Sequence, residues 1–357
     1  MTAAPRRFAV GCYTPDGAGP AVHLVERDAE GGWRVVTSAA ASNASFLAVA
    51  GDVWFAVGED AAGSVVSLRL DLGEVDGADA DGAHASLVPI ASVVHGEADP
   101  CHVVVAADHG VLLVANYTGG SVTAVPFEPS GELGRPVTLA LPHRTGPVAD
   151  RQEAPHAHQL AATPWGTYLV SDLGGDAIHE LVVERVTDAA APTLRIVRTL
   201  ELPPGTGPRH LLVGGGLLHV VGELDGRLHT FELDAANVAP SGTEPAAAPP
   251  AEGGSGADGR VVQPSHLDRA PSGRLFTALV RGRDTVSVFE ATDAAHPRLA
   301  AELPIGAAWP RHHAHLDDRT VVVAAQEGNA LVELDLVTGA ARGALELTAP
   351  ACVVPLP

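Results

Sequence analysis

The chain contains no lysine, one methionine and three cysteines among its 357 residues. Without lysine, it cannot form a lysine Schiff base, hold a nucleotide phosphate with a Walker-type lysine or use a serine–lysine nucleophile pair. The three cysteines, Cys12, Cys101 and Cys352, are too few for a disulfide framework. We therefore expect three reduced thiols and a cytoplasmic protein.

Positive charge is also scarce, because 22 basic residues face 43 acidic ones and the formal net charge is −21. A protein that binds nucleic acid or an anionic membrane needs a basic face, so we expect neither partner. No apolar run approaches the roughly 20 residues of a membrane-spanning helix. The two arginines near the start precede no apolar run of the kind found in a signal peptide.

What the chain does contain is a repeated strand pattern. Short runs rich in Val and Leu, such as 113–125 and 322–334, are interrupted by Gly, Asp or Asn, which indicates strands joined by tight turns. The pattern occurs seven times. The first apolar residues after the seven turns are Val22, Val65, Val122, Ile178, Leu228, Val286 and Leu331.

These seven markers lie 43 to 58 residues apart, a spacing typical of β-propeller blades lengthened by loops. We predict an all-β chain that folds as one seven-bladed β-propeller over residues 1–357. The closing segment, 341–357, is expected to add a strand to the N-terminal blade. That strand would close the ring and leave no free sheet edge.

Two segments depart from the repeat. Residues 236–260 are rich in Pro, Gly and Ala, and we predict a flexible loop inserted in the fifth blade. Residues 73–85 carry four acidic side chains in a pattern that lacks the closing glutamate of a calcium-binding loop. We interpret this acidic segment as a solvated loop, with any ligand left open.

Histidine is the most informative residue type in this chain, which has 17. Five histidines lie 18 to 20 residues before a strand marker, just before the strand that is expected to open each blade: His102, His158, His210, His266 and His312. Since that strand lines the channel of a propeller, the five imidazoles are predicted to surround one channel mouth. The alternative is a repeated packing device in which each histidine caps a turn.

Arginine precedes the histidine twice, at Arg209 and Arg311. Charged side chains that converge on a narrow channel must find partners there, so convergent Arg and His favour an anionic small molecule as ligand. The turn-preceding position supplies further polar residues, namely Glu59, Tyr117, Glu223 and Arg281, with Asp172 one place earlier. Glu223 is either a general acid or base or the partner of a structural ion pair with Arg209 or Arg281.

The histidine-rich motifs at 156–158 and 312–315 have spacings that could ligate zinc or iron. The neighbouring arginines oppose a cation, so we predict no metal and no other cofactor.

Several motifs resemble, in chain order, those of the seven-bladed lactonase family, whose members include propeller-type 6-phosphogluconolactonases and 3-carboxy-cis,cis-muconate lactonizing enzymes. The matching stretches span most of the chain: DPCHVVVAADHGVLLVANYTGGSVTAV, APHAHQL, TGPRHL, VVGEL, PSGRLFTALVRGRD and WPRHHAHLDDRTVVVAAQ. The sequence departs from the family pattern in its turns, since the family's asparagine is kept at Asn116 but is replaced by Asp172 and Gly222 elsewhere.

The resemblance implies a hydrolase of carbohydrate metabolism that opens a sugar lactone, with the reaction of 6-phosphogluconolactonase in the pentose phosphate pathway as the nearest type. It implies a catalytic set that consists of His156 or His158, Arg209, Glu223 and Arg281. The expected substrate-binding residues are His102, Tyr117, His210, His266, Arg311 and His312. Two alternatives stay open, a muconate-lactonizing cycloisomerase and a non-enzymatic propeller that binds a partner through its rim.

Overall fold

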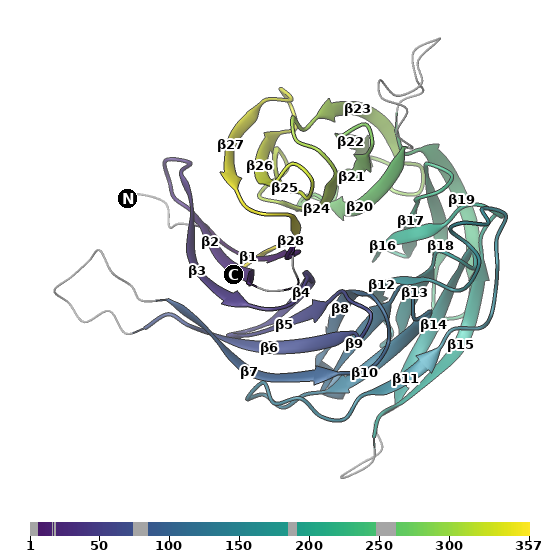
Figure 1. The fold of residues 1–357 in the computed structure, drawn as a ribbon. Coiled ribbons are helices and arrows are strands. Elements are labelled where there is room, and N and C mark those ends of the chain that lie inside the picture. The colour runs from purple at the N-terminus through teal and green to yellow at the C-terminus, as the bar shows by residue number, and fades with distance from the viewer. Residues whose placement is uncertain (1–5, 16, 18, 74–84, 185–190, 248–261) are drawn as a thin grey trace.

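The computed structural model describes residues 6–15, 17, 19–73, 85–184, 191–247 and 262–357. These residues form seven four-stranded antiparallel sheets arranged in a ring (Figure 1). The prediction of an all-β, seven-bladed propeller is confirmed. The one helical element among the described residues is the short 3-10 turn η1 (Ala107–His109), so none of their helices is long and apolar enough to cross a membrane.

Four strands make up each blade, ordered from the innermost, beside the channel, to the outermost. Blade 1 contains β28 (Pro350–Pro355), β1 (Arg6–Cys12), β2 (Pro20–Arg27) and β3 (Trp33–Ala40). Blade 2 contains β4 (Ala44–Ala50), β5 (Val53–Gly58), β6 (Ser64–Asp71) and β7 (Ser86–Val94). Blade 3 contains β8 (Pro100–Ala106), β9 (Val111–Asn116), β10 (Ser121–Pro126) and β11 (Val137–Ala140). Blade 4 contains β12 (Ala157–Ala162), β13 (Tyr168–Asp172), β14 (Ala177–Glu184) and β15 (Thr193–Glu201).

The last three blades follow the same order. Blade 5 contains β16 (Pro208–Gly214), β17 (Leu217–Gly222), β18 (Arg227–Leu233) and β19 (Val238–Pro245). Blade 6 contains β20 (Gln263–Arg269), β21 (Leu275–Arg281), β22 (Thr285–Glu290) and β23 (Arg298–Pro304). Blade 7 contains β24 (Pro310–His315), β25 (Thr320–Ala325), β26 (Ala330–Asp335) and β27 (Ala341–Glu346).

The ring is closed by the end of the chain. Strand β28 pairs antiparallel with β1, with Ala9 opposite Val354 and Val10 opposite Val353. Figure 1 shows the C-terminus beside β1. The predicted closing strand is therefore confirmed, and it gives β1 a partner on each side, which removes a free edge.

The predicted loop at 236–260 has a different start and a different place. Val238–Pro245 forms β19, the outer strand of blade 5, and pairs with β18 from Arg227 to Leu233. An outer strand needs only one apolar face, so its Pro and Gly content is tolerated. The rest of the segment follows blade 5 instead of interrupting it, and 248–260 lie outside the described residues, as do 74–84 of the acidic segment.

The apolar core is divided into seven clusters, one between each pair of neighbouring blades. Both faces of the middle strands are therefore buried, which explains their continuous apolar runs. In β9, for example, all six residues are buried. Burial of one large apolar side chain stabilises the fold by about 1.5–3 kcal/mol, so each blade depends on both of its neighbours.

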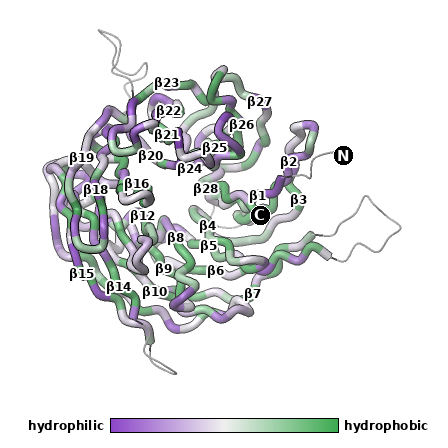
Figure 2. The backbone as a smooth tube through the Cα atoms, turned by 180° about the vertical axis from the view of Figure 1, so that it is seen from behind, coloured by the Kyte–Doolittle hydropathy of each residue, from purple (hydrophilic) through white to green (hydrophobic). Residues whose placement is uncertain are grey.

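The outermost strands are different, because one edge and much of one face meet solvent. Strand β15 alternates between exposed and half-buried residues along its whole length. Figure 2 shows the corresponding hydrophilic residues at the periphery of the ring, around β15. The outermost strands thus carry the charge that faces solvent, and the middle strands carry the apolar surface.

The innermost strands are also joined by hydrogen bonds from side chains of one blade to the backbone of the next. Ser45 Oγ donates to the carbonyl of Pro100 at 3.4 Å, and Ser265 Oγ donates to the carbonyl of Pro310 at 2.8 Å. Cys101 Sγ contacts the carbonyl of Ala157 at 3.6 Å in the same manner. Ser45 and Cys101 are the second residues of β4 and β8, and Ser265 is the equivalent residue of β20, which begins one residue earlier.

The next residue along the innermost strand bonds in the opposite sense, because its side chain accepts a hydrogen bond from the backbone N–H of the following blade. His102 Nδ1 accepts from the backbone N–H of Leu160 at 3.4 Å, and His312 Nδ1 accepts from that of Val353 at 3.3 Å. In blade 4 the side-chain carbonyl of Gln159 accepts from the backbone N–H of the following blade. A side-chain acceptor at this position therefore satisfies a buried N–H of the next innermost strand.

We expect removal of residues 350–357 to abolish cooperative folding. This deletion uncovers one edge of β1 and removes Ala351, Cys352 and Val353, each no more than 1% exposed. The loss of burial is roughly 3–6 kcal/mol, comparable with the stability of a typical domain. Thermal unfolding followed by circular dichroism measures the effect. Deletion of residues 2–5, which leaves the β1–β28 pairing intact, is the control, and equal melting temperatures for both truncations would contradict the closure role.

Candidate active site

One structural position recurs at the end of the channel where the innermost strands begin. In six blades it is the residue that directly follows the second strand, and its backbone N–H donates to the carbonyl of the residue that precedes the innermost strand, at 2.9–3.0 Å. In blade 6 the equivalent residue is Arg281, the last of β21, which pairs with Gln263. The seven residues at this position, four of which the sequence pattern identified, are Tyr13, Glu59, Tyr117, Leu173, Glu223, Arg281 and Gln326. Because their backbones are fixed alike, their side chains converge on one end of the channel.

Glu223 is the centre of this group. Its Oε2 lies 2.8 Å from Nε of Arg209 and 2.6 Å from Nη2 of Arg281, and its Oε1 lies 2.5 Å from Nη2 of Arg151. Glu223 and Arg209 are 3% and 2% exposed. One buried carboxylate therefore holds three guanidinium groups from three different blades or loops.

The protonation of Glu223 follows from these partners. Burial raises the pKa of its carboxyl group, but the charges of Arg281, Arg209 and Arg151 outweigh burial and leave the pKa at about 2. Both oxygens of this carboxylate are occupied by guanidinium groups, so neither is free to accept a proton from water. The geometry thus favours the ion-pair interpretation of Glu223 over that of a general base.

A second ion pair lies on the other side of the same channel end. Arg311 Nη2 is 2.9 Å from Oε2 of Glu59, which also accepts a hydrogen bond of 2.7 Å from the Tyr13 hydroxyl. The Arg311 guanidinium lies over the Tyr13 ring, 5.1 Å from its centroid. Together with Arg151, Arg209 and Arg281, four guanidinium groups face two carboxylates, so the cluster has a surplus of positive charge.

Tyr117 connects this cluster to blade 4. Its hydroxyl accepts a hydrogen bond of 3.2 Å from Arg151, and its ring stacks on that of His156 with centroids 4.4 Å apart. His156 Nδ1 bonds to the Tyr117 carbonyl at 3.0 Å, and Nε2 bonds to Glu153 Oε1 at 3.1 Å. Both ring nitrogens of His156 are therefore engaged.

His158 is placed differently. Within the described part of the chain neither of its ring nitrogens makes a hydrogen bond, and Nδ1 is buried. Burial and the charges of Arg209, Arg311 and Arg281 hold its pKa well below the ordinary value for histidine. His158 is thus a neutral imidazole with uncommitted nitrogens among three guanidinium groups.

The remaining four predicted histidines pack against one another inside the channel. Centroid distances are 6.1 Å from His102 to His210, 4.8 Å from His210 to His266 and 3.8 Å from His266 to His312. Phe46 of blade 2 completes this histidine layer, with its ring centroid 4.1 Å from that of His102. All four histidines are buried, so they fill the channel instead of lining an open mouth, and their role as substrate contacts stays a prediction.

The histidine layer also carries no charge. Burial lowers the pKa of all four, and repulsion from Arg209 lowers it further, to about 3 for His102 and His312. Neighbouring histidines add to the effect at His102, His210 and His266. The positive charge of this channel end therefore comes from the arginines.

Two details of the predicted histidine positions need correction. The histidines lie within the innermost strands and not before them, as the pairing of His210 with Val221 shows. In blade 4 the residue equivalent to His210 is Gln159, whereas His158 occupies the position of Arg209. The turn between the innermost and second strands covers residues 163–167 in blade 4 but only 215–216 in blade 5, so a count back from the marker reaches different structural positions.

The motif at 312–315 does not act as one unit. His312 belongs to the histidine layer, whereas His313 and His315 contact blade 6 through Thr277 Oγ1, at 2.7 Å from Nε2 of each ring. The argument that neighbouring arginines exclude a metal therefore applies to His156 and His158 but not to this pair.

Two residues of the cluster were missed in the sequence. Tyr13 occupies the turn-preceding position of the first, degenerate repeat, so applying the phase to that copy would have found it. Arg151 lies in the connection between β11 and β12, outside the repeat, and carried no periodic signal. Asp172 is a structural residue, whose Oδ1 accepts the backbone N–H groups of His156 and Gly175 at 2.8 and 3.0 Å.

Comparison with known proteins gives consistent matches. The family model described as "Lactonase, 7-bladed beta-propeller" matches residues 7–357. The 6-phosphogluconolactonase of Bacillus subtilis strain 168 is 29% identical over 247 residues, which cover 67% of each chain. A crystal structure from Bacteroides fragilis is 21% identical with a TM-score of 0.83, covering 100% of this chain and 99% of the other. The periplasmic gluconolactonase of Pseudomonas aeruginosa is 24% identical with a TM-score of 0.82, covering 99% of both.

We expect His102→Gln to make the protein less sensitive to acid. The folded-state pKa of His102 is about 3, lowered by burial and by His312 and Arg209, whereas an unfolded histidine titrates near 6.5. Between about pH 6.5 and pH 3 the unfolded state therefore binds a proton that the folded state does not bind. The stability present above about pH 6.5 is lost as the pH falls toward 3. Glutamine does not titrate, and Gln159 shows that it makes the same inter-blade bond.

Denaturant unfolding at pH 7.5 and pH 5.5 measures this difference. The variant should lose about 1.4 kcal/mol less stability than wild type between the two pH values. His102→Leu, which removes the acceptor as well, should also cost about 1–3 kcal/mol at pH 7.5. An identical acid response of wild type and His102→Gln would rule out a neutral, buried His102.

Proposed function

The chain belongs to the seven-bladed β-propeller lactonase family, and on that premise we propose that it hydrolyses a sugar lactone bearing an anionic group, of the 6-phosphogluconolactone type. The observation that carries the proposal is the placement of the neutral His158 among Arg209, Arg281 and Arg311. Such a site combines a proton acceptor with donors for negative charge, the two components that opening of a lactone by water requires.

His158 is the proposed general base. Its uncommitted nitrogen takes a proton from water as the water oxygen attacks the lactone carbonyl carbon. When the tetrahedral intermediate collapses, the bond from this carbon to the ring oxygen breaks, and the imidazolium returns its proton to that oxygen. The products are a hydroxyl group and a carboxylic acid, which ionises at neutral pH and releases one proton to the solvent, and no other reactant is needed. The surrounding arginines keep the resting imidazole neutral, at the expense of basicity.

Arginine is the proposed stabiliser of the oxyanion. Arg209 Nη1 donates to the carbonyl of Ser265 at 2.6 Å, and Nε lies 2.8 Å from Glu223 in an ion pair without hydrogen-bond geometry. Its Nη2 makes no hydrogen bond within the described residues and is the donor left for a ligand. A guanidinium fixed in this way needs no reorganisation when charge develops on the carbonyl oxygen.

Glu223 is then a positioning residue and not the base. Its carboxylate orients Arg209, Arg281 and Arg151 and reduces their mutual repulsion. Its single negative charge does not neutralise the three guanidinium groups. The remaining positive charge suits a phosphate or carboxylate group on the substrate. Tyr117 and His156 lie beside this arginine cluster, with their two rings stacked on each other.

The proposal extends to the compartment. The three cysteines are free and buried, which fits a reducing compartment, and we propose that the protein is cytoplasmic. A small anionic lactone is the proposed partner.

We expect His158→Gln to lower kcat on 6-phosphogluconolactone by about 10²–10⁴, the usual contribution of a general base, with little change in melting temperature. Since His158 makes no hydrogen bond through its ring among the described residues, the substitution breaks none. His156→Gln is the comparison, because both of its nitrogens are engaged. Base-catalysed hydrolysis measured by proton release gives the rates. A full loss in His156→Gln with normal turnover in His158→Gln would reverse the assignment.

We expect Arg151→Gln to reduce the preference for a phosphorylated lactone. Arg151 is 29% exposed at the edge of the cluster, so it can reach a substrate phosphate, and its loss should raise KM more for 6-phosphogluconolactone than for gluconolactone. Arg144→Gln is the matched control, because Arg144 lies in the same connection, is 32% exposed and pairs with Glu201. An equal change of KM for both substrates would exclude this role.

The same assays separate the other candidate functions. Ring closure of a carboxymuconate without opening of any lactone would favour a cycloisomerase. Absence of turnover, together with no rise in melting temperature on adding gluconate 6-phosphate, would favour a propeller without enzymatic activity.

A further inference from the structure

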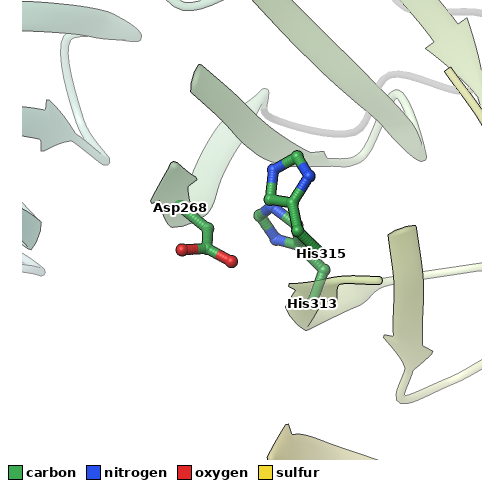
Figure 3. Close-up of side chains that lie close together, drawn as sticks. All are labelled: Asp268, His313 and His315. Atoms are coloured by element: carbon green, nitrogen blue, oxygen red, sulfur yellow. The ribbon is translucent and has the colours of Figure 1, made fainter. Parts of the chain in front are cut away.

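A second polar cluster lies further along the innermost strands of blades 6 and 7. It consists of Asp268 on β20 and of His313 and His315 on β24. One potential ligand atom from each residue lies within 4.8 Å of the other two. Figure 3 shows the carboxylate of Asp268 and the two imidazoles side by side, supplied by the two neighbouring strands.

The strand geometry explains why these three residues meet. His313 and His315 are two residues apart on β24, so their side chains lie on the same face of the strand. Both contact Thr277 Oγ1 in blade 6 through Nε2, at 2.7 Å each, so the two rings converge on one point. Asp268 pairs with Thr277 in the register of β20 and β21, which brings its carboxylate to the same region.

The positively charged or titratable groups that act on the carboxylate of Asp268 are His315 and Arg269. Within the described residues it takes part in no ion pair, and it accepts the backbone N–H of Arg269 at 2.8 Å. The Arg269 guanidinium lies instead over the ring of Phe276, 5.3 Å from its centroid. A half-buried carboxylate beside two imidazoles, with its charge unbalanced by an ion pair, is a good cation ligand.

The surroundings also differ from those of the arginine cluster. Along β24, Arg311 lies two residues before His313 and four before His315, or roughly 7 and 13 Å. His313 Nδ1 lies 2.9 Å from Nδ1 of His266 in the histidine layer, so this layer stands between the cluster and the arginines. Asp317 and Asp318 follow His315 in the chain and contribute negative charge at this point. The local field therefore favours a cation, unlike that at the other end of the channel.

We propose that Asp268, His313 and His315 bind one divalent transition-metal ion, with Zn²⁺ as the best match to their donor atoms. Two imidazoles and one carboxylate form a donor set that suits Zn²⁺, Fe²⁺ or Co²⁺ and is too rich in nitrogen for Mg²⁺ or Ca²⁺. Three protein ligands leave a position for water, and the half-buried Asp268 and His315 leave the site accessible. The ion would link the innermost strands of blades 6 and 7.

Titration of the chelator-treated, full-length protein with Zn²⁺ alone tests the proposal. Calorimetry should show one ion bound per chain, and the melting temperature should rise with Zn²⁺ concentration as expected for a ligand of the folded state. Co²⁺ alone should give visible absorption bands of a nitrogen- and oxygen-ligated ion. If neither ion binds at about 100 µM, the dissociation constant is too high for a specific site, and the proposal is overturned.

Two variants and one control locate the ion. His315→Gln and Asp268→Asn should each weaken Zn²⁺ binding by at least about tenfold. His296→Gln is the control, because His296 forms an exposed pair with Asp293 in blade 6 at 2.9 Å and should bind Zn²⁺ like wild type. If Asp268→Asn proves unstable, His315→Gln still decides. Unchanged binding in His315→Gln, or equal loss in His296→Gln, would place the ion elsewhere and refute the site.

Discussion

The structure depends on the packing of each blade between two others. The apolar faces of each sheet are covered by the neighbouring sheets. Each of the seven apolar clusters therefore belongs to two blades. The pairing of β28 with β1 makes this arrangement circular, so that the first blade is supported as the others are. The circle holds the starts of seven innermost strands at fixed positions around one axis, where polar side chains have little freedom to move apart.

That confinement determines the electrostatics of the candidate active site. Four guanidinium groups are brought together, and Glu223 and Glu59 are the carboxylates that reduce their repulsion. A histidine next to them cannot also be charged, which is why the pKa of His158 is far below its ordinary value. The neutral imidazole is thus a consequence of the arginine cluster. The same arginines that attract an anionic substrate keep the proposed base in its proton-accepting form.

The repeat predicted the fold well because it depends on period and not on individual residues. Markers such as Val122 and Val286 lie in the third strands of their blades, and the spacing between markers survives long loops. Single residues were harder to place. The turn after the innermost strand differs in length between blades, so the residue count selected His158, whereas the structural equivalent of His210 is Gln159. Arg151 comes from a connection outside the repeat, so its contact with Glu223 depends on how a loop crosses the site.

The histidine layer connects these observations. It lies between an arginine-rich channel end and a second cluster where Asp268 and two histidines stand near further acidic residues. A charged layer would be attracted to one end and repelled by the other, whereas neutral imidazoles are compatible with both. They still offer nitrogen acceptors, with which His102 and His312 satisfy backbone N–H groups of the following blade. Histidine suits this position because its aromatic ring packs, its nitrogen accepts a hydrogen bond and burial keeps it uncharged. Leucine offers no acceptor, and Gln159, which takes this position in blade 4, offers the acceptor without the ring.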